Sequence, residues 1–256
     1  MTKKSIFKTE ILSFIFVVLA IMAGCANAGN KAIQPQKPNA LTKEEIAQGF
    51  ELLFDGTLES VQKNFKGVAD DNKAINTAWI IRDGAICNPI KEERSENISG
   101  SIVTKKQYAN FDFRLDYKLE PLPEGKSVNS GIKYFAYPGK ELGLEYQLFN
   151  ADAKVEGPHA LADLYDLLPA KSRKANPPGE WNTVRIVARG GFVEHYLNGV
   201  KVLRYERGGE EFRAAVAKSK FKDLDNFGQA EQGHILLQDH GGGIAFRNIR
   251  IRVLKD

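Results

Sequence analysis

The sequence predicts an all-β fold, an antiparallel β-sandwich or jelly roll with one short N-terminal helix. From Phe111 to Leu119, apolar and charged side chains alternate without a break, which indicates a strand with one buried and one solvated face. An Asn-Gly pair at 198–199 lies between two strand-like runs and favours a two-residue hairpin turn. The clearest helix signal covers only residues 41–49. Many strands joined by regular turns, with almost no helix, are typical of sandwiches and jelly rolls.

The N-terminus has the pattern of an export signal. Three lysines in the first eight residues precede a mostly apolar run from Ile11 to Gly24, which is too short to span a bilayer as a mature helix. The run ends in Met-Ala-Gly before Cys25, which resembles a lipobox, the signal whose cysteine is lipidated and becomes the mature N-terminus. We therefore expect a signal peptide at 1–24 and lipidation of Cys25. The alternative is an ordinary signal that is cut near Ala28.

A tether and a single domain are expected after the signal. Residues 25–40 are small and polar with two prolines, a composition that cannot bury a core and predicts a flexible tether. Residues 41–256 are enough for one domain, since all-β domains commonly reach about 200–250 residues. Loss of the signal peptide lowers the formal net charge from +4 to about +2, so nothing indicates a nucleic-acid surface. With Cys25 lipidated, Cys87 has no intrachain disulfide partner, and the fold must depend on its hydrophobic core.

The elements of the domain follow from local patterns. Thr42 can cap the helix, with Glu45 three residues later and Gly49 at the end. Further strands are expected at 143–149, 181–189, 192–205, 234–239 and 244–254, and a helical or irregular excursion at 212–225. In the last strand Phe246 is out of phase with the later apolar positions, which predicts a bulge near Asn248.

The strand at 143–149 carries the first candidate for catalysis. Alternation places Glu145 and Gln147 on one face, opposite Leu144, Tyr146 and Leu148. If that face is the concave side of the sheet, both side chains point into a cleft; the alternative is a solvated outer face. A conventional glycosidase uses two carboxylates about 5–10 Å apart. Gln147 is neutral, which disfavours that mechanism here.

Histidines and one loop supply the other candidates. His195 lies in a strand just before the hairpin, where a core position is the alternative to a catalytic one. His240 ends a strand at a glycine turn, where a polar side chain can reach a site from a rigid element. Its neighbour Asp239 faces the other way unless the strand bends. Asp163 and Tyr165 lie in a loop-like stretch that either binds a ligand or is merely solvated.

Several segments together resemble one family, the 3-keto-disaccharide hydrolases. In chain order they are Gly-Phe-Glu-Leu-Leu-Phe-Asp-Gly at 49–56, Trp79 with Asp-Gly at 83–84, Asn-Ser-Gly-Ile at 129–132, Leu-Glu-Tyr-Gln at 144–147, Ala-Asp-Leu-Tyr-Asp at 162–166, Glu-Trp-Asn at 180–182, Glu-His-Tyr-Leu-Asn-Gly at 194–199, Leu-Gln-Asp-His-Gly at 237–241 and Phe-Arg-Asn-Ile at 246–249. The resemblance spans about Gly49 to Leu254.

The resemblance implies a concanavalin-like jelly roll and the cleavage of glycosides already oxidised to a ketone at sugar carbon 3. Partner oxidoreductases make that ketone. A ketone at C3 acidifies the hydrogen on C2, so a base can remove it, the C1 substituent leaves by β-elimination, and water then completes the net hydrolysis. This route needs one base, donors for the enediolate and an acid for the leaving group, rather than two carboxylates.

That chemistry gives the candidates their expected roles. The predicted acid–base set is Glu145, His195 and His240. Sugar hydroxyls or the enediolate are expected to contact Gln147, Asn129, Asp163 and Tyr165, and Asp239 could hold a histidine tautomer. No motif requires a cofactor and no metal ligand is assigned, although a divalent metal held by Glu and His could polarise the ketone.

The expected protein is an enzyme lipid-anchored at the cell envelope, on the outer membrane or the periplasmic face. It contacts the membrane only through its lipid, takes an oxidised oligosaccharide or glycoside as substrate, and is functionally coupled to a sugar 3-oxidoreductase. One alternative is a non-catalytic carbohydrate-binding module on the same scaffold. It would need exposed aromatics, for which the candidates are Trp79, Trp181, Tyr134 and Tyr137, with both tryptophans expected in the core. The other is a conventional glycoside hydrolase.

Overall fold

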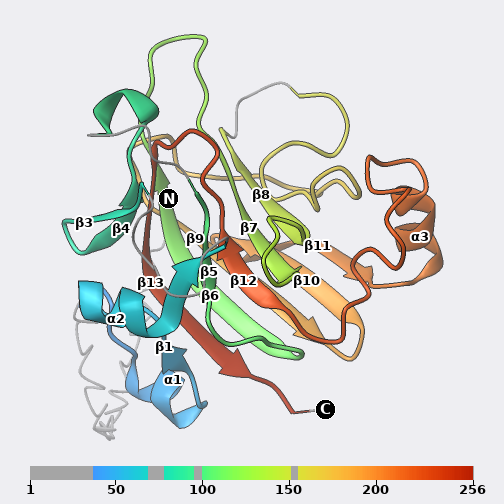
Figure 1. Cartoon of the computed structure of the whole chain (residues 1–256), viewed down its shortest axis with the longest axis horizontal. Coiled ribbons are helices and arrows are strands. Elements are labelled where there is room, and N and C mark those ends of the chain that lie inside the picture. Colours follow the sequence, from blue (N-terminus) through green and yellow to red (C-terminus); the bar gives the residue numbers. More distant parts are fainter. Residues whose placement is uncertain (1–36, 69–77, 95–99, 151–154, 256) are drawn as a thin grey trace, which may run out of the picture. The chain divides into compact units, whose positions relative to one another are not determined.

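Two antiparallel sheets pack face to face in the computed structural model, which describes residues 37–68, 78–94, 100–150 and 155–255 (Figure 1). Cys25, the signal peptide and most of the tether lie outside the described residues. In chain order the elements are α1 Lys43–Ala47, β1 Glu51–Leu52, α2 Leu58–Asn64, β2 Phe65–Gly67, β3 Ile80–Arg82, β4 Ala85–Asn88, the 3₁₀ turn η1 Lys91–Glu93, β5 Ile102–Thr104, β6 Phe111–Leu119, β7 Asn129–Ala136, β8 Leu144–Phe149, β9 Asn182–Arg189, β10 Phe192–Leu197, β11 Val200–Glu206, α3 Glu210–Val216, β12 His234–Leu237 and β13 Ile244–Val253.

The two sheets differ in size. Within the described ranges, one sheet has eight strands in the order β11-β10-β9-β6-β13-β4-β3, with β1 paired to β13, and the other has five in the order β2-β5-β12-β7-β8. Helices α1 and α2 lie at one side of the sandwich and α3 at the other (Figure 1). The all-β antiparallel sandwich with a short N-terminal helix is therefore confirmed.

The core lies between the sheets and follows the two-residue period of the strands. On β6, Phe111, Phe113, Leu115 and Tyr117 are all buried. From the smaller sheet, alternate residues of β7 and β8 point at the same interior and include Ile132, Tyr134, Leu144, Tyr146 and Leu148. Burial of each large apolar side chain contributes about 1.5–3 kcal/mol. The sandwich thus has its own hydrophobic core, as expected for a domain without a disulfide.

The outer face of β6 differs from its prediction at one residue. Asp112, expected in solvent, is 0% exposed. It is buried because three arginines surround it: Arg114 and Arg185 each donate two hydrogen bonds at 2.9–3.0 Å, and Arg252 donates one at 3.2 Å. Burial by itself raises the pKa of this carboxyl, but the hydrogen bonds from Arg114 and Arg185 outweigh it, and the pKa is lowered. The alternation of apolar and charged residues predicts which face Asp112 lies on, but it does not predict this ion cluster.

Three local predictions are confirmed. Thr42 and Glu45 form a reciprocal capping box at the start of α1. The β10–β11 hairpin turns at Asn198 and Gly199, which have φ of +48° and +80°, as a type I′ turn requires. In β13 the register with β6 shifts between Arg247 and Arg250, at the predicted bulge.

The boundary between tether and domain lies earlier than predicted. Asn39, assigned to the tether, is buried, and its backbone N–H donates to Asn248 Oδ1 at 2.6 Å. Asn248 N–H returns a bond to Asn39 Oδ1 at 2.8 Å, and Asn39 Nδ2 donates to Gly84 O at 2.7 Å. Residues 37–40 therefore belong to the folded unit. Nowhere in the described ranges is a helix both long and apolar enough to cross a membrane.

Candidate active site

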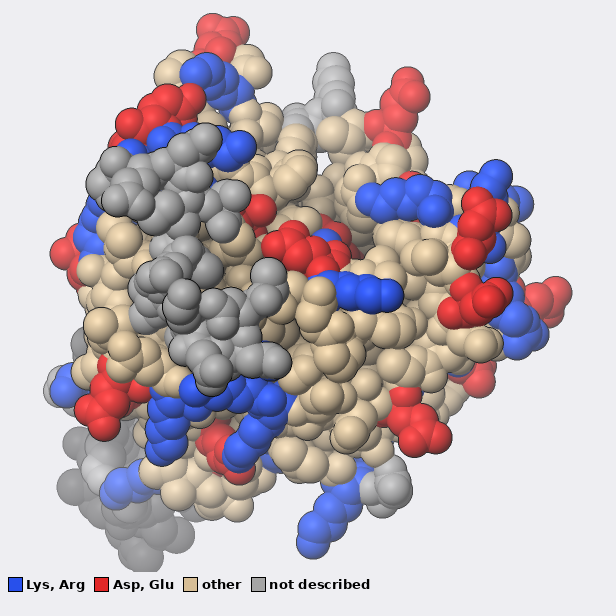
Figure 2. Space-filling model, in the orientation of Figure 1, with Lys and Arg blue, Asp and Glu red and all other residues tan. Residues whose placement is uncertain are grey.

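The strongest candidate site lies on the outer face of the five-stranded sheet. As predicted, Glu145 and Gln147 share one face of β8, opposite the buried Leu144, Tyr146 and Leu148. Across the strand pair, Lys133 is opposite Glu145, and Gly131 is opposite Gln147. Figure 2 shows acidic and basic side chains meeting in a hollow near the centre of the face that carries β7, β8 and β12.

A buried ion pair lies at the centre of this site. Lys133 Nζ is 3.7 Å from Glu145 Oε2, and the two side chains are 10% and 9% exposed. The same ammonium donates to the backbone oxygen of Glu141 at 2.8 Å. Burial raises the pKa of Glu145, and the charge of Lys133 opposes that shift without cancelling it. A carboxylate with a raised pKa is a stronger base than an exposed one, and it has an ammonium beside it.

Two neighbouring charged groups shift the pKa of Glu145 in opposite directions. The carboxylate of Glu141 accepts a hydrogen bond from Ser101 N–H at 3.2 Å, and its charge raises the pKa of Glu145 further. Lys220 acts in the opposite direction. Its Nζ lies 4.3 Å from the centre of the Tyr165 ring, and Tyr165 N–H donates to Glu145 O at 3.0 Å. The backbone of Tyr165 therefore runs beside that of Glu145.

Side-chain amides line the floor of the hollow next to this ion pair. Gln147 Nε2 donates to Asn129 Oδ1 at 3.2 Å, so these two predicted ligands are adjacent. Gln238 N–H donates to Gly131 O at 3.0 Å, which places Gln238 on the other side of Gly131 from Gln147. The Oε1 atoms of Gln147 and Gln238 are both buried and accept no hydrogen bond within the described structure.

His195, predicted in the acid–base set, is instead a fully buried residue of the core. Its Nδ1 is 2.9 Å from Ala162 O, which can only accept, so Nδ1 carries the proton. Its Nε2 then accepts from Tyr134 O–H at 2.7 Å, and Tyr134 accepts from Tyr205 O–H at 2.7 Å. Burial lowers the pKa of His195 to about 4, so the ring stays neutral near pH 7. This geometry supports the core alternative, and His195 fixes the 160–166 segment that runs beside β8.

Two predicted aspartates hold the backbone rather than face the hollow. Asp163 is 0% exposed and accepts from Ala160 N–H at 2.8 Å, from Ala170 N–H at 2.7 Å and from Arg173. Asp239 is held by Arg94 at 2.9 and 3.1 Å and by Gly100 N–H at 2.9 Å. Neither is placed to contact a sugar. The partner of Asp239 is an arginine, and the expected histidine contact is absent among the described residues.

His240 is exposed, in the turn that follows Gln238 and Asp239. No described residue bonds to its ring or fixes it towards Glu145. The residues that sequence reasoning did not select are Lys133, Glu141 and Gln238. Lys133 had a usable signal, because it is the one charged residue in the strand from Asn129 to Ala136. Glu141 and Gln238 had none, since their approach to the site depends on how separate segments fold together.

Comparison with known proteins identifies the family. The family model described as the 3-keto-alpha-glucoside-1,2-lyase-like domain matches residues 49–252. The chain belongs to this family. A 3-keto-disaccharide hydrolase from Bacteroides thetaiotaomicron is 29% identical over 258 residues, covering 88% of this chain and 85% of that protein. The resemblance seen in the sequence is thereby confirmed.

Solved structures of related proteins share the fold. One from Parabacteroides distasonis, provisionally named a glycosyl hydrolase, superposes with a TM-score of 0.73 at 29% identity, over 86% of this chain and 100% of that one. A second of the same name and organism gives 0.54 at 26% identity, over 74% and 99% of the two chains.

The four aromatic side chains that the sequence offered for a sugar-binding module do not form a platform in the described structure. Trp79 and Tyr134 are buried in the core. Trp181 is half-buried rather than in the core as predicted, and its ring is covered by Arg247 at 4.0 Å and Lys118 at 5.0 Å. Among the four predicted aromatics, only Tyr137 retains a partly exposed ring without such a cover in the described structure. The clustered titratable groups around Glu145 favour an enzyme instead.

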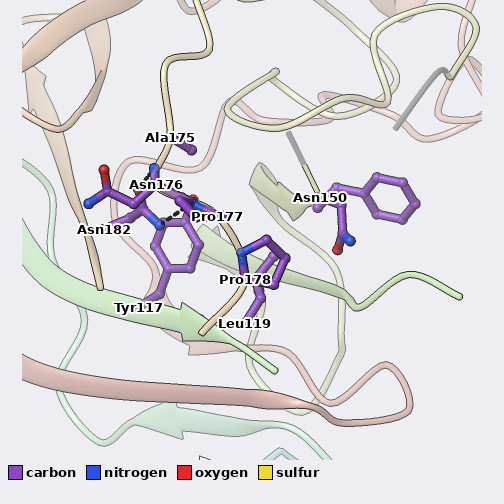
Figure 3. Close-up of a pocket in the computed structure, with 9 residues that line it drawn as sticks. Tyr117, Leu119, Asn150, Ala175, Asn176, Pro177, Pro178 and Asn182 are labelled. Carbon is purple, nitrogen blue, oxygen red and sulfur yellow. Dashed lines mark hydrogen bonds between the residues drawn. The ribbon is translucent and has the colours of Figure 1, made fainter. Parts of the chain in front are cut away.

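A cavity of about 230 Å³ lies elsewhere, and neither Lys133 nor Glu145 lines it (Figure 3). At one side Asn176 N–H donates to Asn182 Oδ1 at 2.7 Å, and Asn150 lies at the other (Figure 3). The remaining lining residues are Tyr117, Leu119, Phe149, Ala175, Pro177 and Pro178. Burial raises the pKa of Tyr117, the one titratable group in this lining. The cavity therefore offers no base for proton abstraction near neutral pH.

The described residues contain no group of three or more His, Cys, Asp or Glu side chains placed to hold a metal ion. Around Glu145 the described oxygen ligands are its own carboxylate, that of Glu141, which already accepts from Ser101 N–H, and neutral amides, with an ammonium 3.7 Å from Glu145 Oε2. A nearby ammonium opposes the binding of a second cation by charge repulsion. The chemistry of the site is therefore best derived from its own side chains.

Proposed function

We propose that this protein cleaves glycosides that carry a ketone at sugar carbon 3, by elimination across C1 and C2 followed by addition of water. Membership of the family and the name of the Bacteroides relative support the substrate class. The observation that carries the proposal is the buried Glu145 with its raised pKa, 3.7 Å from the Lys133 ammonium. This pair provides one base and one cationic donor, which an elimination needs, without a second carboxylate.

In the proposed mechanism, Glu145 removes the proton from C2 and becomes protonated. The electron pair of the broken C–H bond moves toward the C3 carbonyl, so negative charge develops on the ketone oxygen. Lys133 stabilises this enediolate because its ammonium lies beside the base in a site shielded from water. The C3 carbonyl then re-forms, the C2–C3 double-bond pair moves to form a C1–C2 double bond, and the C1–O bond breaks with its electron pair on the departing group. Water adds to C1 and a proton returns to C2, which completes the net hydrolysis.

The leaving group needs a proton, and we assign its delivery to two groups. Protonated Glu145 can return the proton it removed, and Tyr165, whose backbone N–H bonds to Glu145 O and whose ring contacts Lys220, is the second. Gln147 and Asn129 supply hydrogen-bonding groups for the ring hydroxyls. His195 and Asp163 act indirectly, because they hold the segment that carries Tyr165.

The test is release of the aglycone from a 3-keto-glucoside and from its unoxidised parent by the purified protein. We expect release from the ketone only. In Glu145→Gln the rate should fall by about 10²–10⁴-fold, the usual contribution of a positioned acid or base. Glu231→Gln, at an exposed glutamate outside the site, is the matched control and should keep the wild-type rate. Equal release from both substrates would indicate a conventional glycosidase, and sugar binding without release would indicate a binding module.

We also propose that the enzyme works at the cell envelope, held by a lipid on Cys25. The support is the signal-like N-terminus with its lipobox-like end. Two acyl signals or more anchor a protein durably, whereas a single chain gives only marginal binding. Metabolic labelling with a fatty acid should mark the wild-type protein and not Cys25→Ser. Label on both, or on neither, would refute the anchor.

The substrate chemistry requires a second enzyme in the same compartment. Oxidation of a sugar hydroxyl at carbon 3 must precede cleavage, so we propose functional coupling to a sugar 3-oxidoreductase. A divalent metal is tested separately by dialysis against a chelator before the assay. Full activity after dialysis would assign all of the acid–base chemistry to protein side chains.

A further inference from the structure

The outer face of the five-stranded sheet holds a pair of buried hydrogen-bond acceptors whose individual partners the proposed elimination does not assign. Gln147 is 2% exposed, and its Nε2 is engaged by Asn129, which leaves its Oε1 buried and unbonded. Gln238 Oε1 is also buried and unbonded among the described residues. A buried acceptor left without a donor is costly in a folded protein, and such a group points to a bound water, ion or ligand.

The strand register puts these two glutamines on either side of Gly131. Gln147 pairs with Gly131 from β8, and Gln238 follows β12 and donates its N–H to Gly131 O. Gln238 has the same parity as Leu236, which pairs with Lys133, so its side chain belongs to the face that carries Lys133. Adjacent strands lie about 4.8 Å apart, so the Cα atoms of the two glutamines are roughly 10 Å apart. Between them Gly131 contributes no side chain.

Glu145 uses the space above this glycine. A Cβ at residue 131 would lie 2.2 Å from Glu145 Oε1 and 2.9 Å from its Cγ. The carboxylate therefore extends over the floor that the two glutamines border, and a group bound between them lies against the proposed base. The oxygen atoms that border this floor are Glu145 Oε1 and the Oε1 atoms of the two glutamines, and the Lys133 ammonium lies 3.7 Å from the carboxylate.

We propose that Gln147 and Gln238 form a subsite whose side-chain oxygens accept hydrogen bonds from unoxidised hydroxyls of the substrate sugar. The inference rests on the proposed function, since it names the part of the 3-keto sugar that this floor recognises. The site has two sides of opposite polarity: Lys133 donates to the ketone oxygen, which can only accept, and the glutamine oxygens accept from hydroxyls, which can donate. A sugar with its ketone at the glutamine side would leave both acceptors unpaired, so the pair determines which way the ring enters.

A cation is the other ligand that three oxygen atoms could attract. The Lys133 ammonium, 3.7 Å from the same carboxylate, already neutralises it and repels a second positive charge. Neutral hydroxyl donors carry no such penalty. They also match amide oxygens in strength and geometry.

The test is a coupling measurement between enzyme and sugar. Binding of a methyl glucoside and of its deoxyfluoro analogues at carbons 4 and 6 is measured by calorimetry with wild type, Gln147→Met and Gln238→Met. Fluorine can accept a hydrogen bond but cannot donate one. We expect one analogue to bind wild type about tenfold more weakly, or worse, since the acceptor is left unpaired. That loss of affinity should shrink to less than about threefold in the variant that lacks the glutamine facing the replaced hydroxyl.

The control is Gln232→Met, at an exposed glutamine just before β12, which should preserve the discrimination. Thermal melts separate misfolding from loss of a contact. Equal binding of parent and analogues by the wild-type protein would overturn the subsite, as would losses that persist unchanged in both variants. Binding of Ca²⁺ or Mg²⁺ that either glutamine variant abolishes would assign the oxygens to a cation instead. Because the parent glucoside is not cleaved under the proposal, these outcomes stand apart from the aglycone-release assay.

Discussion

Replacement of Lys133 by methionine tests whether the ion pair controls the ionisation of the proposed base. The ammonium is 3.7 Å from Glu145 Oε2, and both side chains are about one-tenth exposed. At an effective dielectric constant of about 20, two unit charges at this distance attract by roughly 4 kcal/mol. If only a third of that attraction survives local solvent and relaxation, about 1.4 kcal/mol, the protonation equilibrium of Glu145 still changes tenfold.

The sign follows from the two opposing causes. Burial raises the pKa of Glu145 and Lys133 lowers it, so loss of Lys133 must raise the pKa further. Fewer molecules then carry the free carboxylate at a given pH. We expect the acid limb of the kcat/KM profile on a 3-keto-glucoside to move to higher pH in Lys133→Met. The plateau should also fall, because the enediolate loses its cationic donor.

Lys140→Met is the matched control. Lys140 is exposed in the connection between β7 and β8 and has no described contact with Glu145. Its acid limb should coincide with that of wild type. Circular dichroism and a thermal melt establish that both variants are folded. An acid limb that stays in place in folded Lys133→Met would refute the idea that this pair sets the protonation of the base.

Three further predictions concern positions that shape or support the site. Gly131→Ala should lower kcat by about 10²-fold, because its Cβ would lie 2.2 Å from Glu145 Oε1 and displace the base; unchanged kcat would contradict the packing. Asp112→Asn should lower the unfolding free energy by about 3 kcal/mol. This value is at the lower end of the range for breaking a buried ion pair, because the arginine partners of Asp112 are partly exposed. An unfolding free energy within about 0.5 kcal/mol of wild type in a denaturant titration would count against it. His195 has a pKa of about 4 when folded and 6.5 when exposed, so the unfolded chain binds the extra proton between these values and stability falls by about 3 kcal/mol as pH drops through that window. In His195→Gln this part of the slope should vanish, whereas the exposed His240→Ala should keep it; identical slopes in all three proteins would rule out the buried neutral histidine.

Much of the fold follows from short-range patterns. The capping box at Thr42 and Glu45, the Asn198-Gly199 hairpin and the bulge near Asn248 each depend on a few neighbouring residues, and each is confirmed. The face shared by Glu145 and Gln147 is also local, because alternate residues of a strand point the same way whatever lies around them.

The histidine and aspartate assignments needed information that is not local. From the sequence, His195 is either a core or a catalytic residue, and Asp163 either binds a ligand or is solvated. Burial decides between them, and burial depends on Tyr134, Tyr205 and Arg173, which come from other elements. Asp112 is another residue whose burial could not be predicted locally. Its position on an outward face does not indicate the arginines that enclose it.

The sequence by itself determined the class of fold, the family and the one carboxylate on which the proposed chemistry rests. These depend on periodicity and on motifs that a single strand or turn can carry. Only the tertiary structure decided which groups surround that carboxylate. Lys133 comes to it through the β7–β8 register, Glu141 through the connection between those strands, and Gln238 through a strand about a hundred residues away in the chain. The physical reason is that a pKa and a binding surface depend on distances in space, which no pattern along one strand contains.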